Sequence, residues 1–227
     1  IYTSTPDGRP SPRARKAYLN TSYAKPFVGD DTKGLYLMSD GCQLYEELCQ
    51  RKKDYGFKIM WELPTNIGDD PAKYGEFLDQ VRWADIYSLN KQESFKLFSV
   101  DNEQDAIKKI LDIGLPCFYR VGKKGSYMIA GDRCYFFPAV NIVDPKDEKD
   151  ATGCGNSSTA AVMWGFCEGY DPIMTAMIGN VMSGYNAMQY GSVVLLWKEI
   201  NKDVWSNAKQ FYDGYLIDHS IDHKIIW

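Results

Sequence analysis

A glycine-rich stretch at residues 150–158 has the residue types and spacing best suited to chemistry. It reads DATGCGNSS, and an apolar helical segment follows at residues 159–166. Gly153 and Gly155 permit a tight turn and a close approach of another molecule to the backbone. The first N–H groups of a helix lack internal partners, and the helix dipole adds about half a positive charge there. The stretch predicts an anion site, most naturally for phosphate, while a plain Gly-x-Gly start of a buried helix fits the spacing equally well.

Histidine offers little for catalysis in this chain. His219 and His223 are the two histidines, and both lie near the end of the sequence. Their spacing of four residues can bind a metal on a helix, but a polar terminal segment is the commoner explanation. A mechanism that needs a central histidine therefore has no candidate.

Composition excludes several classes of protein. The chain has 227 residues, 44% of them hydrophobic and 25% charged, which is typical of globular proteins and excludes disordered and collagen-like chains. A net charge of −4 argues against a general nucleic-acid binder. No leader is visible and no apolar run reaches about 18 residues, so we expect no membrane segment. The six cysteines form no C-x-x-C pair, which favours reduced thiols in a cytoplasmic protein.

Strands and helices are expected to alternate from residue 35 onward. Strands are predicted at 35–38, 57–61, 84–88 and 117–121, with a hairpin between 126–130 and 134–137. Helices are predicted around 44–49, at 71–81 with Pro71 first, at 92–98, 103–113 and 204–212, and in two pieces within 152–190. This alternation predicts a three-layer, doubly wound α/β fold with a mainly parallel sheet and helices on both faces. Ligands in such sheets bind at the carboxyl ends of the strands.

The glycine-rich stretch resembles a signature of the ribokinase-like (PfkB) sugar and nucleoside kinases, Asp-Thr-x-Gly-Ala-Gly-Asp before a long helix. Asp150, Gly153 and Gly155 match it, whereas Ala151 replaces the Thr and Cys154 the Ala. Three more stretches are similar to the family: strand 83–89 leading into Asn90-x-x-Glu93, the turn from Arg120 through Gly122 to Gly125, and the helix at 179–191. In order and spacing they cover roughly residues 35 to 200.

The resemblance implies an ATP- and Mg²⁺-dependent kinase that phosphorylates a sugar or nucleoside hydroxyl. Its catalytic residues would be Gly153, Cys154, Gly155 and Asn156, the first three acting through backbone N–H groups. Its nucleotide-binding residues would be Thr152, Gly122, Gly125 and Asn180, the last near the adenine. Asn90 and Glu93 would orient Mg²⁺ through waters.

Each of these roles has a structural alternative. Asn90 and Glu93 have the spacing of a helix capping box. Gly122 and Gly125 could form a plain hairpin turn, and Arg120 stands where the family has Thr. Asn180 could be a polar helix residue with a satisfied partner.

Asn156 is the main departure from the family, which has Asp there as the general base. A neutral amide cannot take the proton from a hydroxyl, and general base catalysis contributes ~10²–10⁴-fold. Phosphoryl transfer depends mostly on positioning and charge stabilisation. We therefore expect a slow kinase or, alternatively, an inactive sugar- or nucleotide-binding regulatory protein. Asp150 and Asp147 are the candidates for a substitute carboxylate.

The N-terminal region also departs from the family. Nothing in the sequence matches the family's first signature, which carries sugar contacts and a small β lid, so that part of the fold is expected to be missing. We predict that residues 1–34 form a loop returning from the lid and that residues 35–227 form the nucleotide-binding domain. The resemblance implies a small-molecule partner and a homodimer, with no nucleic acid and no membrane.

Overall fold

The structure is a computed structural model that describes residues 31–38, 42–140, 142, 146, 148–190, 197–221 and 226–227. Residues 1–30, Asp147 and His223 lie outside the described residues. The lid-return assignment of residues 1–34 and the carboxylate role of Asp147 therefore stay predictions.

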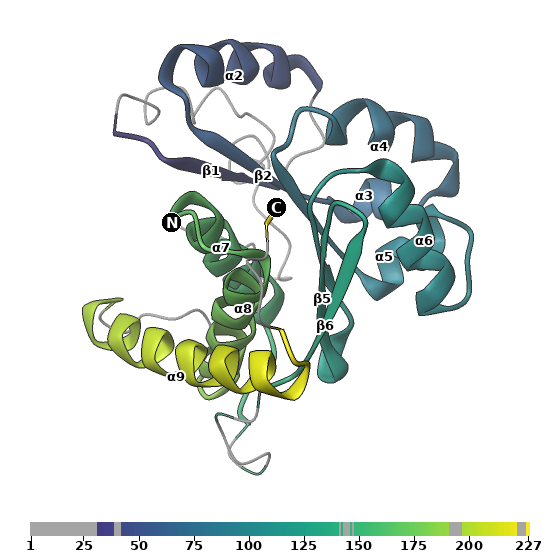
Figure 1. The fold of residues 1–227 in the computed structure, drawn as a ribbon. Coiled ribbons are helices and arrows are strands. Elements are labelled where there is room, and N and C mark those ends of the chain that lie inside the picture. Colours follow the sequence, from purple (N-terminus) through teal and green to yellow (C-terminus); the bar gives the residue numbers. More distant parts are fainter. Residues whose placement is uncertain are drawn as a thin grey trace, which may run out of the picture.

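Within the described residues, six strands form one sheet in the order β1-β2-β3-β4-β5-β6 (Figure 1). They are β1 (Gly34–Leu37), β2 (Lys58–Glu62), β3 (Ile86–Asn90), β4 (Cys117–Arg120), β5 (Gly125–Ala130) and β6 (Arg133–Pro138). The first four strands pair in parallel, and β5 and β6 join them antiparallel. The mainly parallel sheet and the predicted hairpin are confirmed.

Helices cover both faces of this sheet (Figure 1). They are α2 (Cys42–Tyr55), α3 (Thr65–Gly68), α4 (Tyr74–Val81), α5 (Lys91–Leu97), α6 (Glu103–Ile113), α7 (Cys154–Cys167), α8 (Pro172–Ala187) and α9 (Trp197–Asp218), with 3-10 turns η3 (Pro71–Lys73) and η4 (Gly122–Lys124). Alternate side chains of β2 enter opposite cores: Ile59 and Trp61 pack with α4, α5 and α6, while Met60 packs with α7, α8 and α9. The predicted three-layer α/β arrangement is therefore confirmed, because the period of two along the strand separates the two cores.

The ends of several elements differ from the sequence prediction. Pro71 opens the 3-10 turn η3, capped by the Asp70 side chain, and α4 itself begins at Tyr74. β3 begins at Ile86 rather than residue 84, because the N–H of Ala84 donates to the Val81 carbonyl and closes the turn after α4. In both cases a hydrogen-bonded turn comes first, so the helix and the strand begin later in the sequence than predicted.

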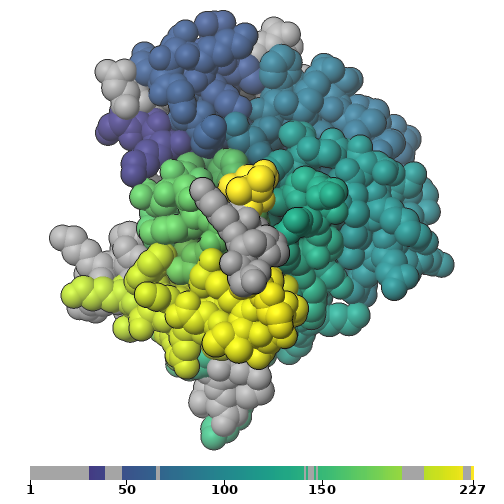
Figure 2. Space-filling model, viewed as in Figure 1, coloured from purple at the N-terminus to yellow at the C-terminus, as the bar shows by residue number. Residues whose placement is uncertain are grey.

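Helix α9 is longer than the predicted segment at 204–212. Over residues 202–218 of this helix, the buried side chains are Val204, Ala208 and Tyr215, and exposed polar residues between them hide the periodicity. The rings of Tyr215 and Phe137 lie with centroids 4.8 Å apart, and Figure 2 shows the yellow α9 segment beside the green α7–α8 region and the teal β5–β6 region. Among the described helices, none combines the length and apolar character needed to cross a membrane.

The break between α7 and α8 falls where the sequence predicted it. Asp171 is the N-cap of α8, and its side chain accepts hydrogen bonds from the N–H groups of Ile173 and Met174. Pro172 follows as the first helical residue, where its missing N–H costs nothing. The two helices pack on one face of the sheet, so the N-terminus of α7 comes to the carboxyl ends of the parallel strands.

Candidate functional site

The N-terminus of α7 is open. Gly153 is its N-cap in the left-handed conformation, with φ 86°, and no side chain caps the helix. The N–H of Cys154 donates to the Ala151 carbonyl and that of Ser157 to the Gly153 carbonyl. Within the described part of the chain, the N–H groups of Gly155 and Asn156 have no acceptor. Two donors at the positive end of the helix dipole are thus available to an anion.

Hydroxyl groups fix the first turn of α7. Ser157 Oγ donates to the Cys154 carbonyl (3.1 Å), and Ser158 Oγ and Thr159 Oγ1 both donate to the Gly155 carbonyl (2.8 and 2.9 Å). Thr159 Oγ1 also lies 3.3 Å from Ser88 Oγ on β3. The first three contacts brace the turn from within the helix, and the contact between Thr159 and Ser88 joins the helix to the sheet.

Asn186 on α8 anchors the loop from behind and is a residue that the sequence analysis missed. Its Nδ2 donates to the Thr152 carbonyl (2.9 Å) and to Cys154 Sγ (3.4 Å), and the side chain is buried. Cys154 Sγ also lies 3.4 Å from the Ser183 carbonyl. A second amide in the mostly apolar segment 172–187, beside Asn180, was the available signal.

A cavity of about 540 Å³ opens at this helix end. Six of the ten predicted functional residues line it: Asn90, Gly122, Gly125, Cys154, Gly155 and Asn180. Phe118, Ser126, Ser183 and Gly184 add lining from β4, β5 and α8. Its volume falls in the usual range for small-molecule sites.

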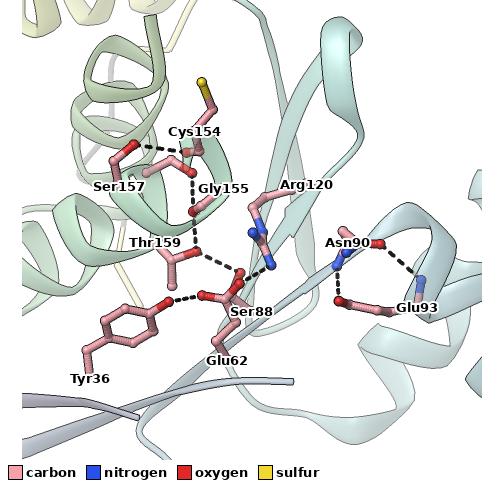
Figure 3. Close-up of polar contacts among 11 residues, drawn as sticks. Tyr36, Glu62, Ser88, Asn90, Glu93, Arg120, Cys154, Gly155, Ser157 and Thr159 are labelled. Carbon is pink, nitrogen blue, oxygen red and sulfur yellow. Dashed lines mark hydrogen bonds and ion pairs between the residues drawn. The ribbon is translucent and has the colours of Figure 1, made fainter. Parts of the chain in front are cut away.

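Asn90 and Glu93 form a complete capping box at the start of α5 (Figure 3). The N–H of Glu93 donates to Asn90 Oδ1 (3.0 Å), and the N–H of Asn90 donates to Glu93 Oε2 (2.7 Å). Burial raises the pKa of the Glu93 carboxyl, against the opposing effects of the Asn90 hydrogen bond and nearby Arg120. A Cβ on Gly68 would overlap the Glu93 side chain, so a glycine in α3 makes room for it. Asn90 faces the cavity, whereas Glu93 is outside its lining.

The three remaining predicted residues that line the cavity lie at or beside the β5–β6 hairpin: Gly122 and Gly125 in the turn before it, and Asn180 on α8. Gly122 is the first residue of η4, Gly125 is its C-cap and the first residue of β5, and both have positive φ. A Cβ on Gly125 would overlap the Phe137 carbonyl. Asn180 Oδ1 accepts a hydrogen bond from Ser126 Oγ (2.7 Å), and its Nδ2 lies 3.4 Å from the Pro138 carbonyl. Its amide therefore ties α8 to the hairpin while bordering the cavity.

Thr152 and Asn156 lie beside the cavity without lining it, as does Gly153. The Thr152 N–H donates to Asp150 Oδ1 (2.8 Å), so Asp150 helps to form the turn. The Asn156 side chain is exposed.

His219, which the sequence offered for metal binding, lies elsewhere. It packs on Tyr215, with ring centroids 3.9 Å apart, and its Nδ1 lies 3.0 Å from the Tyr215 carbonyl. Among the described residues, no cluster of three His, Cys, Asp or Glu could hold a metal.

A buried charged cluster under the open turn was also missed by the sequence analysis (Figure 3). Arg120 Nη2 donates to Glu62 Oε1 at 2.7 Å, and the Tyr36 hydroxyl donates to Glu62 Oε2. The Arg120 and Glu62 side chains are only 13% and 6% exposed. Arg120 lines the cavity, and a Cβ on Gly155 would overlap its Nη1. Charged residues ending two buried strands were the signal, but their partners were invisible in the sequence.

A scan against protein-family models finds no match to this chain. An ATP-dependent 6-phosphofructokinase from Thermoanaerobacterium thermosaccharolyticum is 23% identical over 159 residues, which are 70% of this chain and 46% of that protein. The chain thus spans about half the length of this curated relative.

Solved structures extend the likeness to the fold. Adenosine kinase from Sinorhizobium meliloti superposes with a TM-score of 0.64 at 19% identity, over 81% of this chain and 57% of that one. A putative ribokinase II from E. coli in complex with ATP and Mg²⁺ gives a TM-score of 0.58 at 15% identity, over 86% and 63%. The fold expected from the glycine-rich stretch is confirmed: the chain has the ribokinase-like α/β fold of these sugar and nucleoside kinases.

Proposed function

We propose that the cavity binds ATP with Mg²⁺ and that the protein transfers a phosphoryl group to a hydroxyl of a sugar or nucleoside. The observation that carries this proposal is the meeting of a 540 Å³ cavity with the uncapped first turn of α7. A site for a nucleotide needs both enclosure for the base and free donors for the phosphates, and these coincide here. In this proposal residues 35–227 form the nucleotide-binding domain of a cytoplasmic protein.

The residues present suit this cofactor. The N–H groups of Gly155 and Asn156 would hold the terminal phosphate, while Gly122 and Gly125 leave the cavity wall without side chains near the nucleotide. Asn180 would lie near the adenine, and Thr152, Gly153 and Cys154 would shape the turn. When bound, MgATP supplies the phosphoryl group and the divalent charge that neutralises it.

For Mg²⁺, the capping box limits what Asn90 and Glu93 can do. Glu93 Oε2 and Asn90 Oδ1 each already accept a backbone hydrogen bond. Each oxygen retains a second lone pair, and Mg²⁺ usually keeps several waters. The pair would therefore orient hydrated Mg²⁺ through waters while continuing to cap α5.

Asn156 is the reason for expecting slow phosphoryl transfer. Its amide cannot accept the proton of an attacking hydroxyl, so the protein would position the reactants without a general base at this place. The likeness to kinases in fold supports a sugar or nucleoside as the acceptor. The proposal includes no nucleic acid or membrane as partner, in keeping with the net charge of −4 and the absence of a long apolar run in the sequence. A homodimer is part of the same proposal.

Binding and turnover can be tested separately. MgATP should raise the unfolding temperature of the purified protein, because a ligand that binds only the native state stabilises it. No stabilisation at millimolar MgATP would refute nucleotide binding. Release of ADP with a panel of sugars and nucleosides then tests transfer.

Asn156→Asp is the decisive variant for the chemistry. Restoring the carboxylate should raise kcat by about 10²-fold with the correct acceptor, with little change in the affinity for ATP. Gln210→Glu, an amide-to-acid change at an exposed position of α9 outside the cavity, is the matched control and should leave kcat unchanged. An unchanged kcat in Asn156→Asp would show that the missing base does not limit the rate.

The second candidate is a nucleotide- or sugar-binding regulatory protein without turnover. The neutral, exposed side chain of Asn156 favours it, because the open turn needs no carboxylate to hold an anion. MgATP stabilisation with no ADP release from any acceptor, in both the wild type and Asn156→Asp, would identify this function.

A further inference from the structure

The guanidinium of Arg120 is only partly used by the protein. Nη2 donates to Glu62 Oε1 at 2.7 Å. Among the described residues, the buried Nε has no hydrogen-bond acceptor, and Nη1 has no acceptor either. An arginine has five N–H donors in a fixed planar fork, and a buried donor without an acceptor is costly. The unused donors indicate an acceptor that the protein itself does not supply.

The position of these donors identifies the kind of acceptor. Nη1 lies against Gly155, where a Cβ would overlap it, and Arg120 lines the cavity. Gly155 and Asn156 contribute their free N–H groups at the same point. Figure 3 shows the Arg120 side chain between the first turn of α7 and the Asn90–Glu93 pair. Backbone and side-chain donors therefore converge on one region, which suits an oxyanion with several acceptor oxygens.

The surroundings hold the guanidinium in place. Both oxygens of Glu62 are engaged, one by Arg120 and the other by the Tyr36 hydroxyl. A buried ion pair is seldom the most stable way to fill a core, so its presence beside a cavity favours a role in binding. Glu62 and Tyr36 are positioning residues, since they act through Arg120.

We infer that Arg120 is a phosphate-binding residue that joins the N–H groups of Gly155 and Asn156 in holding the terminal phosphate of the nucleotide. The inference rests on the proposed function. Arginine suits this role because its fork can bind two phosphate oxygens at once.

The test compares ligands with and without phosphate by isothermal titration calorimetry. The probes are adenosine, Mg-ADP and inorganic pyrophosphate. Arg120→Met/Glu62→Gln removes both members of the ion pair, so no unpaired charge is left buried. This double variant should bind adenosine as the wild type does, but bind Mg-ADP and pyrophosphate at least about tenfold more weakly. Arg120→Gln/Glu62→Gln is a second charge-free pair for use if the first variant does not fold.

Arg82→Met is the matched control, because Arg82 lies on the surface after α4 and its side chain is 63% exposed. It should leave all three affinities unchanged. A folded double variant that binds Mg-ADP as tightly as the wild type would overturn the role of Arg120 while nucleotide binding stands. A wild type that binds pyrophosphate through Arg120 but neither ADP nor adenosine would refute the nucleotide while the phosphate site stands. Failure to bind any of the probes would overturn both.

Discussion

Two helices begin at the same edge of the sheet, and their N-termini are built in opposite ways. At α5, the side chains of Asn90 and Glu93 satisfy each other's backbone N–H groups. At α7, Gly153 has no side chain to offer, and the N–H groups of Gly155 and Asn156 have no acceptor among the described residues, with Gly155 lining the cavity. One helix end is closed by its own residues, and the other is left open to a ligand.

The difference shows which sequence patterns predict binding. Asn-x-x-Glu is fully explained by helix capping, so this motif alone would not establish a metal site. Gly-x-Gly leaves donors without partners, and the protein then fixes that uncapped turn with Ser157, Ser158 and Thr159. Polar groups left unpaired in a rigid setting are the stronger sign of function.

The largest effect that tests this contrast is expected from alanine at the second helical residue of each helix. In α7, Gly155→Ala places a Cβ where Arg120 Nη1 lies, so the guanidinium must move away from the open turn. We expect the affinity for Mg-ADP to fall about tenfold, or about 1.4 kcal/mol, measured by titration calorimetry. Gln92→Ala is the equivalent change in α5, at an exposed position, and should have no effect. Equal affinities in the two variants would mean that the open end of α7 does not hold the nucleotide.

Most of the fold could be predicted because its signals are local. Short apolar runs located the strands, the central ones of which are almost wholly buried, and Gly114, the left-handed C-cap of α6, ended its helix where expected. Element ends were less predictable where a turn intervened, as at Pro71 and Ala84. Exposed polar residues also concealed the full length of α9.

The site was only partly predictable, because several contacts join residues far apart in the sequence. The glycine turn could be found from its spacing. Glu62 and Arg120 are 58 positions apart and meet only because β2 and β4 end at the same edge of the sheet. Asn186 reaches Thr152 across 34 positions because α7 and α8 pack side by side. A single sequence gives the residue types at strand ends but not their partners.

A smaller effect is expected from removing the cap of α5. Asn90→Ala deletes the acceptor of the Glu93 N–H and should lower the free energy of unfolding by about 1 kcal/mol. Asn90→Gly should cost only a few tenths of a kcal/mol, because glycine is tolerated at an N-cap. Urea denaturation of both variants provides the measurement. If Asn90→Ala were as stable as the wild type, the capping hydrogen bonds of α5 would not stabilise the protein in solution. The contrast with α7 would then be lost.

The smallest effect on stability is expected from the two ion pairs of Glu103, one of which joins it to the first turn of α5. Lys91, its first residue, donates to Glu103 Oε1 at 2.9 Å, as does Lys124. The hydrogen bond from Lys91 lowers the pKa of the Glu103 carboxyl. Burial opposes this effect, and the hydrogen bond from Lys124 adds to the lowering. A carboxyl whose pKa is lower in the folded state stabilises the protein above its unfolded pKa of about 4.3 and loses that contribution as the pH falls through the folded value.

Glu103→Gln should therefore lower the free energy of unfolding by up to about 1 kcal/mol at neutral pH, since most such pairs contribute little. The difference from the wild type should shrink as the pH falls below about 4, because the native carboxyl is then protonated as well. Urea denaturation across this pH range measures it, with Asp79→Asn as control, because Asp79 forms an exposed i,i+3 pair with Arg82 elsewhere on the surface. A difference that did not change with pH would show that Glu103 acts through packing or neutral hydrogen bonds. In that case the first turn of α5 would be held by the capping box alone. The contrast with the uncapped α7 would then rest on the side chains of Asn90 and Glu93.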